Sequence, residues 1–140
     1  MTVMEAELSD DPQQMNASSP QEGDRIPFVP EFSANAFVEY TKELSGAWTL
    51  ISRADYSYVG KSYTDFRPTS PRYEPMGNYS LVDLRLIFDY DSRHQITLFA
   101  DNLLDESAIV SQIIDGTLRR PNMAIPVHPR TLGVSVSYQF

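Results

Sequence analysis

Residues 80–90 read Ser80-Leu-Val-Asp-Leu-Arg-Leu-Ile-Phe-Asp-Tyr90. After the serine, every even-numbered position is apolar or aromatic, while Asp83, Arg85 and Asp89 all occupy odd positions. Successive side chains of a β-strand point to opposite faces, so this segment predicts a strand with one apolar face and one charged face. Its β-branched and aromatic residues are also the types that strands favour.

The same period of two recurs through most of the chain. In residues 47–59, Trp48, Leu50 and Tyr56 alternate with positions that include Arg53 and Asp55. The sequence therefore predicts an all-β fold, an antiparallel up-and-down meander of about six strands. The predicted strands lie near residues 2–8, 32–41, 47–59, 79–90, 94–102 and 130–140.

The connections between these strands alternate between short and long. Tight turns are predicted at residues 42–46 and 91–93, and long loops over residues 9–31, 60–78 and 103–129. In an antiparallel meander, alternate connections emerge at opposite ends, so the short turns share one end and the long loops the other. Outer-membrane β-barrels have this asymmetry. Structureless loops of about 20 residues are uncommon in compact soluble domains.

Strand length and charge placement favour the same class of protein. A tilted transmembrane strand needs about 9 to 11 residues, which is close to the length of the predicted strands. A cationic side chain facing lipid near the midplane costs about 2 to 4 kcal/mol, which explains why Arg53 and Arg85 take the polar positions. The alternation also describes a half-buried antiparallel sandwich, so a soluble β-sandwich binding module remains an alternative.

The composition excludes several kinds of chemistry. A net charge of -8 and eleven scattered Lys and Arg residues argue against nucleic-acid binding. The absence of cysteine removes disulfides and thiol chemistry. His94 and His128 have no second ligand at metal spacing, and no calcium-loop pattern organises Asp101, Asp105 and Glu106. Because no nucleophile motif accompanies any serine, the sequence predicts neither an enzyme nor a metal or cofactor site.

Two motifs carry a resemblance to a known family. The last residues, Arg130-Thr-Leu-Gly-Val-Ser-Val-Ser-Tyr-Gln-Phe140, resemble the closing strand of bacterial outer-membrane barrels. The stretch Leu98-Phe-Ala-Asp-Asn-Leu-Leu-Asp-Glu106 looks like the LFxxNLxDE pattern of TonB-dependent receptors. Gly23-Asp-Arg-Ile-Pro-Phe-Val-Pro30 and Gly77-Asn-Tyr-Ser-Leu-Val-Asp-Leu-Arg85 are further echoes of that family. In order and spacing, the chain is similar to the C-terminal end of such a receptor.

The resemblance implies a fragment of a barrel that has about twenty-two strands. Six strands do not close a barrel, so the chain alone is expected to form an open sheet, and no plug domain is expected within residues 1–140. The implied function is part of a Gram-negative outer-membrane receptor for active uptake of a scarce substrate, such as a ferric siderophore. A segment of another, porin-like barrel remains an alternative.

The resemblance also implies sites and partners. The barrel assembly machinery would read the terminal strand through Gly133, Val136, Tyr138 and Phe140. Loop residues of basic or aromatic type would recognise an anionic or aromatic ligand, or else be solvated or contact lipopolysaccharide. These residues are Tyr63, Phe66, Arg67, Arg72, Tyr73, Arg119 and Arg120. The expected partners are outer-membrane lipid, the TonB system through an N-terminal part of the receptor, and a small-molecule or metal-chelate substrate.

Overall fold

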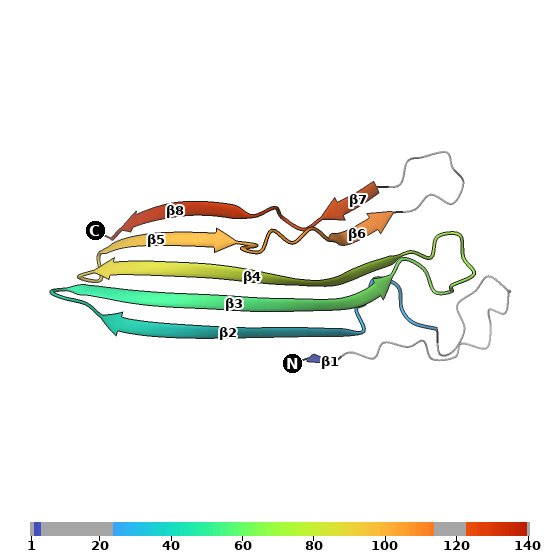
Figure 1. The fold of residues 1–140 in the computed structure, drawn as a ribbon, viewed down its shortest axis with the longest axis horizontal. Coiled ribbons are helices and arrows are strands. Elements are labelled where there is room, and N and C mark those ends of the chain that lie inside the picture. Colours follow the sequence, from blue (N-terminus) through green and yellow to red (C-terminus); the bar gives the residue numbers. More distant parts are fainter. Residues whose placement is uncertain (1, 4–23, 114–122, 140) are drawn as a thin grey trace. The chain divides into compact units, whose positions relative to one another are not determined.

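The fold is an antiparallel β-meander. The computed structural model describes residues 2–3, 24–113 and 123–139. A six-stranded sheet has the order β1-β2-β3-β4-β5-β8, and β6 pairs separately with β7 (Figure 1). The all-β meander of about six strands is thereby confirmed. Within the described ranges, no helix is long and apolar enough to span a membrane. The strands are β1 (Thr2–Val3), β2 (Phe32–Glu43), β3 (Trp48–Tyr63), β4 (Pro75–Tyr90), β5 (His94–Asp101), β6 (Ile109–Ile113), β7 (Met123–Pro126) and β8 (Thr131–Tyr138).

The chain divides into two compact units. The strand unit comprises Ala34–Tyr58, Ser80–Ser107 and His128–Phe140. The loop unit comprises Met1–Ser33, Val59–Tyr79 and Ala108–Val127. Strands β3 and β4 contribute residues to both. The loop unit thus gathers most of the three segments predicted as long loops, while the strand unit contains both predicted short turns.

Strand register places the apolar residues of the strand unit on one face. Leu98 of β5 lies opposite Leu86 of β4 on one side and Val134 of β8 on the other. On the opposite face, Thr97 lies between Ile87 and Ser135. Because pairing joins residues of the same parity, even-numbered side chains form what we call the apolar face, and odd-numbered side chains form the polar wall.

The apolar face is uncovered. Val134 is 65% exposed and Val136 73% exposed, although both are aliphatic. Among the residues that the structure describes, only Met76 and Val127 are buried hydrophobic side chains. A soluble sandwich buries such a face against a second sheet, so the β-sandwich alternative does not describe this molecule.

Both short turns lie at the same end of the strand unit. Leu44 donates a backbone hydrogen bond to Trp48 across the first turn (2.9 Å), and Arg93 donates one to Tyr90 across the second (3.2 Å). Asp91 and Ser92 adopt positive φ angles of 53° and 55°, as the two central residues of a type I′ turn do; residues 91–93 connect the paired residues Tyr90 and His94. The Asp91 amide donates to the Ala47 carbonyl at 3.1 Å and so joins the two turns.

A row of rings follows this turn end. Trp48 and Tyr90 have ring centroids 4.9 Å apart, Tyr90 and His94 lie 5.9 Å apart, and His94 and Tyr138 lie 4.7 Å apart. All four residues are even-numbered, so the aromatic row borders the apolar face. His94 is therefore a member of this row and lies in β5 beside the turn.

The predicted loop over residues 60–78 is too long. Strands β3 and β4 each have 16 residues, which leaves residues 64–74 as the loop. Gly60 and Gly77, both within the predicted loop, lie in β3 and β4. A Cβ atom at Gly77 would overlap the Gly60 carbonyl group. These glycines therefore permit a close backbone approach and do not end the strands.

The loop predicted over residues 103–129 and the strand predicted over residues 2–8 agree only in part with the structure. The loop predicted over residues 103–129 contains the β6–β7 hairpin, whose register shifts between Ile109 and Ser111. Short, irregular pairing of this kind gives no clear period-two signal. Of the strand predicted over residues 2–8, the structure describes Thr2 and Val3, which pair with Ser33 and Phe32. Residues 4–8 lie outside the described ranges, as do residues 9–23 of the predicted loop 9–31.

Candidate functional site

The loop between β3 and β4 is held closed at its base by Thr64. Its amide donates to the Glu74 carbonyl (3.1 Å), and the Glu74 amide donates back to the Thr64 hydroxyl oxygen (2.9 Å). The same hydroxyl donates to the Arg72 carbonyl. These bonds fix both ends of the loop relative to each other.

Asp65 organises the interior of the loop. Its carboxylate accepts hydrogen bonds from the Phe66 amide (2.8 Å) and the Ser70 hydroxyl. The Ser70 hydroxyl bond first, and the Phe66 amide second, lower the pKa of Asp65 below its ordinary value. Asp65 is thus an ionised anchor at neutral pH.

Two tyrosines stack at the edge of this loop. The rings of Tyr63 and Tyr73 are 4.6 Å apart and inclined by only 13°. Burial raises the pKa of Tyr73, and the neighbouring Tyr63 adds to that effect. Tyr73 is therefore an uncharged phenol at neutral pH.

Residues 24–31 close the other side of a cavity, which we call the loop pocket. The Phe28 amide donates to the Tyr63 carbonyl at 2.8 Å, and the Glu31 amide donates to the Lys61 carbonyl at 3.0 Å. The pocket has a volume of about 230 Å³. It is lined by three rings (Tyr63, Phe66, Tyr73), three acids (Asp24, Glu31, Asp65), Arg25, and the apolar residues Ile26, Val29 and Pro68.

The arginines at the loop pocket are paired with carboxylates. Arg67 lies 3.3 Å from Asp24 between Nε and Oδ2, and Arg25 forms an ion pair with Glu31. Arg67 lies in the β3–β4 loop and Asp24 in the segment before β2, so their ion pair links these two parts of the chain. Among the described residues that line the pocket, the acids Asp24, Glu31 and Asp65 therefore outnumber the one cation, Arg25.

The predicted ligand contacts are only partly brought together. Tyr63, Phe66 and Tyr73 line the loop pocket, and Arg67 lies beside it through Asp24. Arg72 is exposed and does not line the pocket. Arg119 and Arg120 lie outside the described residues. Sequence reasoning missed Asp24, Arg25, Glu31 and Asp65, because no local pattern shows that residues 24–31 face the β3–β4 loop. Ligand contact by any of these residues stays a prediction.

The predicted assembly residues that the structure describes lie on β8. Val136 is on the apolar face, and Tyr138 ends the aromatic row against His94. Gly133 pairs with Phe99, and a Cβ atom at Gly133 would overlap the Phe99 ring. Glycine is thus required there so that the ring can lie across β8. Phe140 lies outside the described residues.

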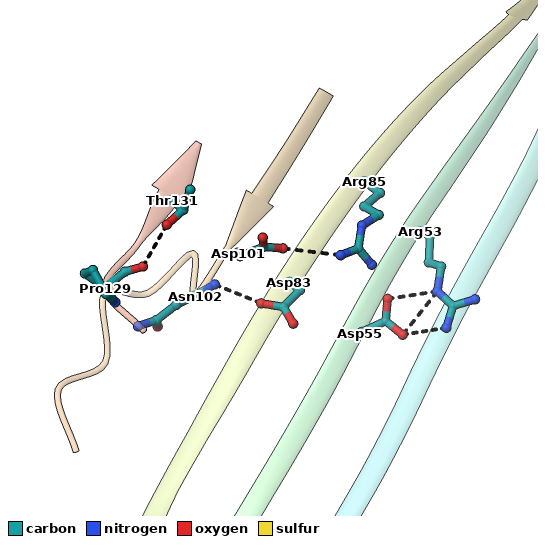
Figure 2. Close-up of polar contacts among 8 residues, drawn as sticks. All are labelled: Arg53, Asp55, Asp83, Arg85, Asp101, Asn102, Pro129 and Thr131. Atoms are coloured by element: carbon teal, nitrogen blue, oxygen red, sulfur yellow. Dashed lines mark hydrogen bonds and ion pairs between the residues drawn. The ribbon is translucent and has the colours of Figure 1, made fainter. Parts of the chain in front are cut away.

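Asn102 forms a buried junction that we call the Asn102 clasp. This side chain is 3% exposed. Its Nδ2 atom donates to the carbonyls of Glu106 (2.9 Å) and His128 (2.8 Å), and its Oδ1 atom accepts from the Glu106 amide (2.9 Å). Its backbone amide donates to Asp83 of β4 at 2.8 Å (Figure 2). One residue therefore joins β4, the turn after β5 and the segment before β8.

Charged side chains of the polar wall pair with one another. Arg53 makes a bidentate contact with Asp55, with its shortest bond at 2.7 Å, and lies 3.7 Å from Glu39. Arg85 and Asp101 are 3.4 Å apart (Figure 2). Opposite charges thus alternate across β2 to β5, which allows odd positions to carry ions without a large net charge.

The acidic residues considered as a calcium site have other partners. Asp101 contacts Arg85, and Asp105 lies 3.6 Å from Arg130. In the described part of the chain, no three His, Cys, Asp or Glu residues are grouped as a metal site would require. His128 is engaged through its backbone carbonyl in the Asn102 clasp.

Comparison with known proteins places this architecture in a family. The family model described as TonB dependent receptor-like, beta-barrel, matches residues 8–103. The chain belongs to the TonB-dependent receptor β-barrel family. No curated protein matches it. The solved structure of the ferric yersiniabactin uptake receptor FyuA from Yersinia pestis is similar, with 25% identity and a TM-score of 0.69. The match covers 84% of this chain and 17% of that receptor.

TonB-dependent receptor barrels reside in the outer membrane of Gram-negative bacteria, and the family is one of transport receptors. In transmembrane barrels, lipid-facing and lumen-facing side chains alternate along each strand. The apolar face and the polar wall of the strand unit have this alternation. Membership of the TonB-dependent receptor family also excludes the porin-like alternative.

Proposed function

We propose that this chain forms part of an outer-membrane receptor for active uptake of a scarce substrate. The family match over residues 8–103 carries this proposal. Similarity to a ferric yersiniabactin uptake receptor supports an iron chelate, such as a ferric siderophore, as the substrate class. The chain spans 17% of that receptor's length, so transport is a property proposed for the whole receptor and not for these strands alone.

The two faces of the strand unit have different roles in this proposal. The apolar face contacts outer-membrane lipid, which accounts for exposed aliphatic residues such as Leu132 and Val136. The aromatic row lies at a membrane–water boundary, where amphipathic rings are favoured. The polar wall lines a hydrated lumen, where paired ions such as Arg85 and Asp101 need no burial.

Three kinds of partner follow from the proposal. The barrel assembly machinery recognises β8 through Gly133, Val136, Tyr138 and Phe140. The TonB system supplies energy through an N-terminal part of the receptor. A small-molecule or metal-chelate substrate contacts the long loops, and the loop pocket is the described site best formed for it. In this scheme the protein is a transport receptor without catalytic residues.

Deletion of the gene tests this function. Cells grown under iron limitation receive a panel of ⁵⁵Fe-loaded siderophores, and accumulation is compared with that of the parent strain. We expect loss of energy-dependent uptake for at least one chelate, restored by the plasmid-borne gene and abolished by a protonophore. Unchanged uptake of every chelate, with the protein present in the parent's outer-membrane fraction, would contradict an iron-chelate substrate.

A further inference from the structure

We propose that the loop pocket binds a neutral or cationic aromatic group of the substrate and discriminates against aromatic carboxylates. This inference rests on the proposed receptor function and deepens it by naming the chemistry of the ligand. The sequence led us to expect an anionic or aromatic ligand, and the inference keeps the aromatic part of that expectation while excluding the anionic part. The argument depends on the size of the pocket, its rings and the pairing of its charges.

The size and shape of the loop pocket suit one substituted ring. An apolar cavity of about 150 Å³ in another protein accommodates benzene, and the loop pocket has about 230 Å³. Tyr63, Phe66 and Tyr73 place three aromatic rings in its lining. Offset stacking and edge-to-face packing on such rings are favourable, so a single ring with one or two substituents fits.

Hydrogen bonds and an ion pair hold the walls of the loop pocket together. Thr64 closes the loop base, Asp65 anchors its interior, and the Arg67–Asp24 pair joins its two sides. Walls held by such bonds lose little conformational freedom when a ligand binds.

The charges of the pocket set its selectivity. Arg25 is neutralised by Glu31, and Arg67 by Asp24. Asp65 lines the same cavity and is ionised. Among the described residues that line the pocket, the one cation, Arg25, is already paired, so a carboxylate that enters would lose water without a matching gain, which is costly. Hydroxyl or ammonium groups on a ring would instead donate to the carboxylate and phenol oxygens. A cation above a tyrosine face is favourable as well.

Binding of three ring compounds to the full chain in detergent micelles tests the inference. The probes are catechol, which is neutral, tyramine, which is cationic, and benzoate, which is anionic. Saturation-transfer NMR titrations should show saturable binding of catechol and tyramine, with benzoate at least about tenfold weaker. Equal binding of benzoate would overturn the proposed selectivity.

Variants locate the binding in the loop pocket. Tyr73→Ala should abolish catechol binding, while Tyr73→Phe keeps the stacked ring and should retain it within about threefold. Tyr40→Ala, on the apolar face, is the matched control and should leave binding unchanged. If Tyr73→Ala binds catechol like the parent chain, the probe lies elsewhere and the inference is wrong.

Glu31→Gln provides a second test that does not remove a ring. It releases Arg25 from its carboxylate partner with almost no change in side-chain shape. Benzoate binding should strengthen by about fivefold or more, while tyramine binding weakens. No change in either would contradict charge pairing as the cause of selectivity. Probe binding requires neither TonB nor uptake, so failure here and loss of the proposed transport function are separate results.

Discussion

Asn102 has a role that its own sequence neighbourhood does not show. The stretch around it was singled out by resemblance, but two of its partners, Asp83 and His128, lie 19 and 26 residues away. Its φ angle of 51° is in the left-handed region, which asparagine tolerates better than most residues. The resemblance singles out Asn102 from the sequence. Its contacts with Asp83 and His128 depend on strand pairing, which the sequence does not show.

Replacement of Asn102 by alanine should destabilise the strand unit. The change leaves the Glu106 amide and two carbonyls without their side-chain partner in a part-buried place, at a cost of up to about 1 to 3 kcal/mol for each group that water does not reach. We expect a lower urea midpoint for unfolding of the full chain in micelles. Thr131→Ala is the control, because the Thr131 hydroxyl makes only an exposed bond to the Pro129 carbonyl (3.1 Å). Equal midpoints for the two variants would show that the clasp adds no stability.

At the scale of elements, sequence periodicity predicts strand interiors better than strand ends. The period of two in residues 80–90 correctly predicts that part of β4. There the strand pairing agrees with the alternation of apolar and polar residues. The predicted strands stop short of the loop ends of β3 and β4, which extend through Gly60 and Gly77. These glycines allow close approach of two backbones, which involves residues distant in the chain.

The β3–β4 loop should lose order in acid. The folded state lowers the pKa of Asp65, so its contribution to stability is present above the ordinary value of about 4 and disappears as pH falls through the lowered value. Tyr63 and Tyr73 side-chain NMR signals should therefore broaden or shift below about pH 4. Asp65→Asn should show this disorder already at neutral pH. A parent chain and an Asp65→Asn variant with the same spectra at all pH values would contradict the anchoring role.

For the whole molecule, the sequence was most informative about the two faces of the sheet. Parity alone separates Arg53 and Arg85 from the aliphatic positions, and strand register preserves that separation across β4, β5 and β8. The loop pocket was not predictable in the same way. It forms between residues 24–31 and 63–73, whose proximity follows from strand order and not from any shared pattern.

Arginine at two neighbouring positions should affect membrane assembly to very different extents. Leu98→Arg places a cation on the apolar face, where lipid contact costs about 2 to 4 kcal/mol near the midplane. Thr97→Arg places the same group on the polar wall, between Ile87 and Ser135. Outer-membrane fractions should contain much less of the Leu98→Arg protein and near-normal amounts of the Thr97→Arg protein. Equal amounts would mean that the two faces are not divided between lipid and lumen.

The Asn102 clasp has a consequence for how the receptor diversifies. It ties the turn after β5 to the segment before β8, and the Val127 amide donates to the Ala108 carbonyl at 2.9 Å. These hydrogen bonds hold the chain together at Ala108 and Val127, before β6 and after β7. We therefore expect changes of length or sequence between Ala108 and Val127 to leave the pairing of β5 with β8 intact, so that new cargo specificity could arise there without rebuilding the barrel wall.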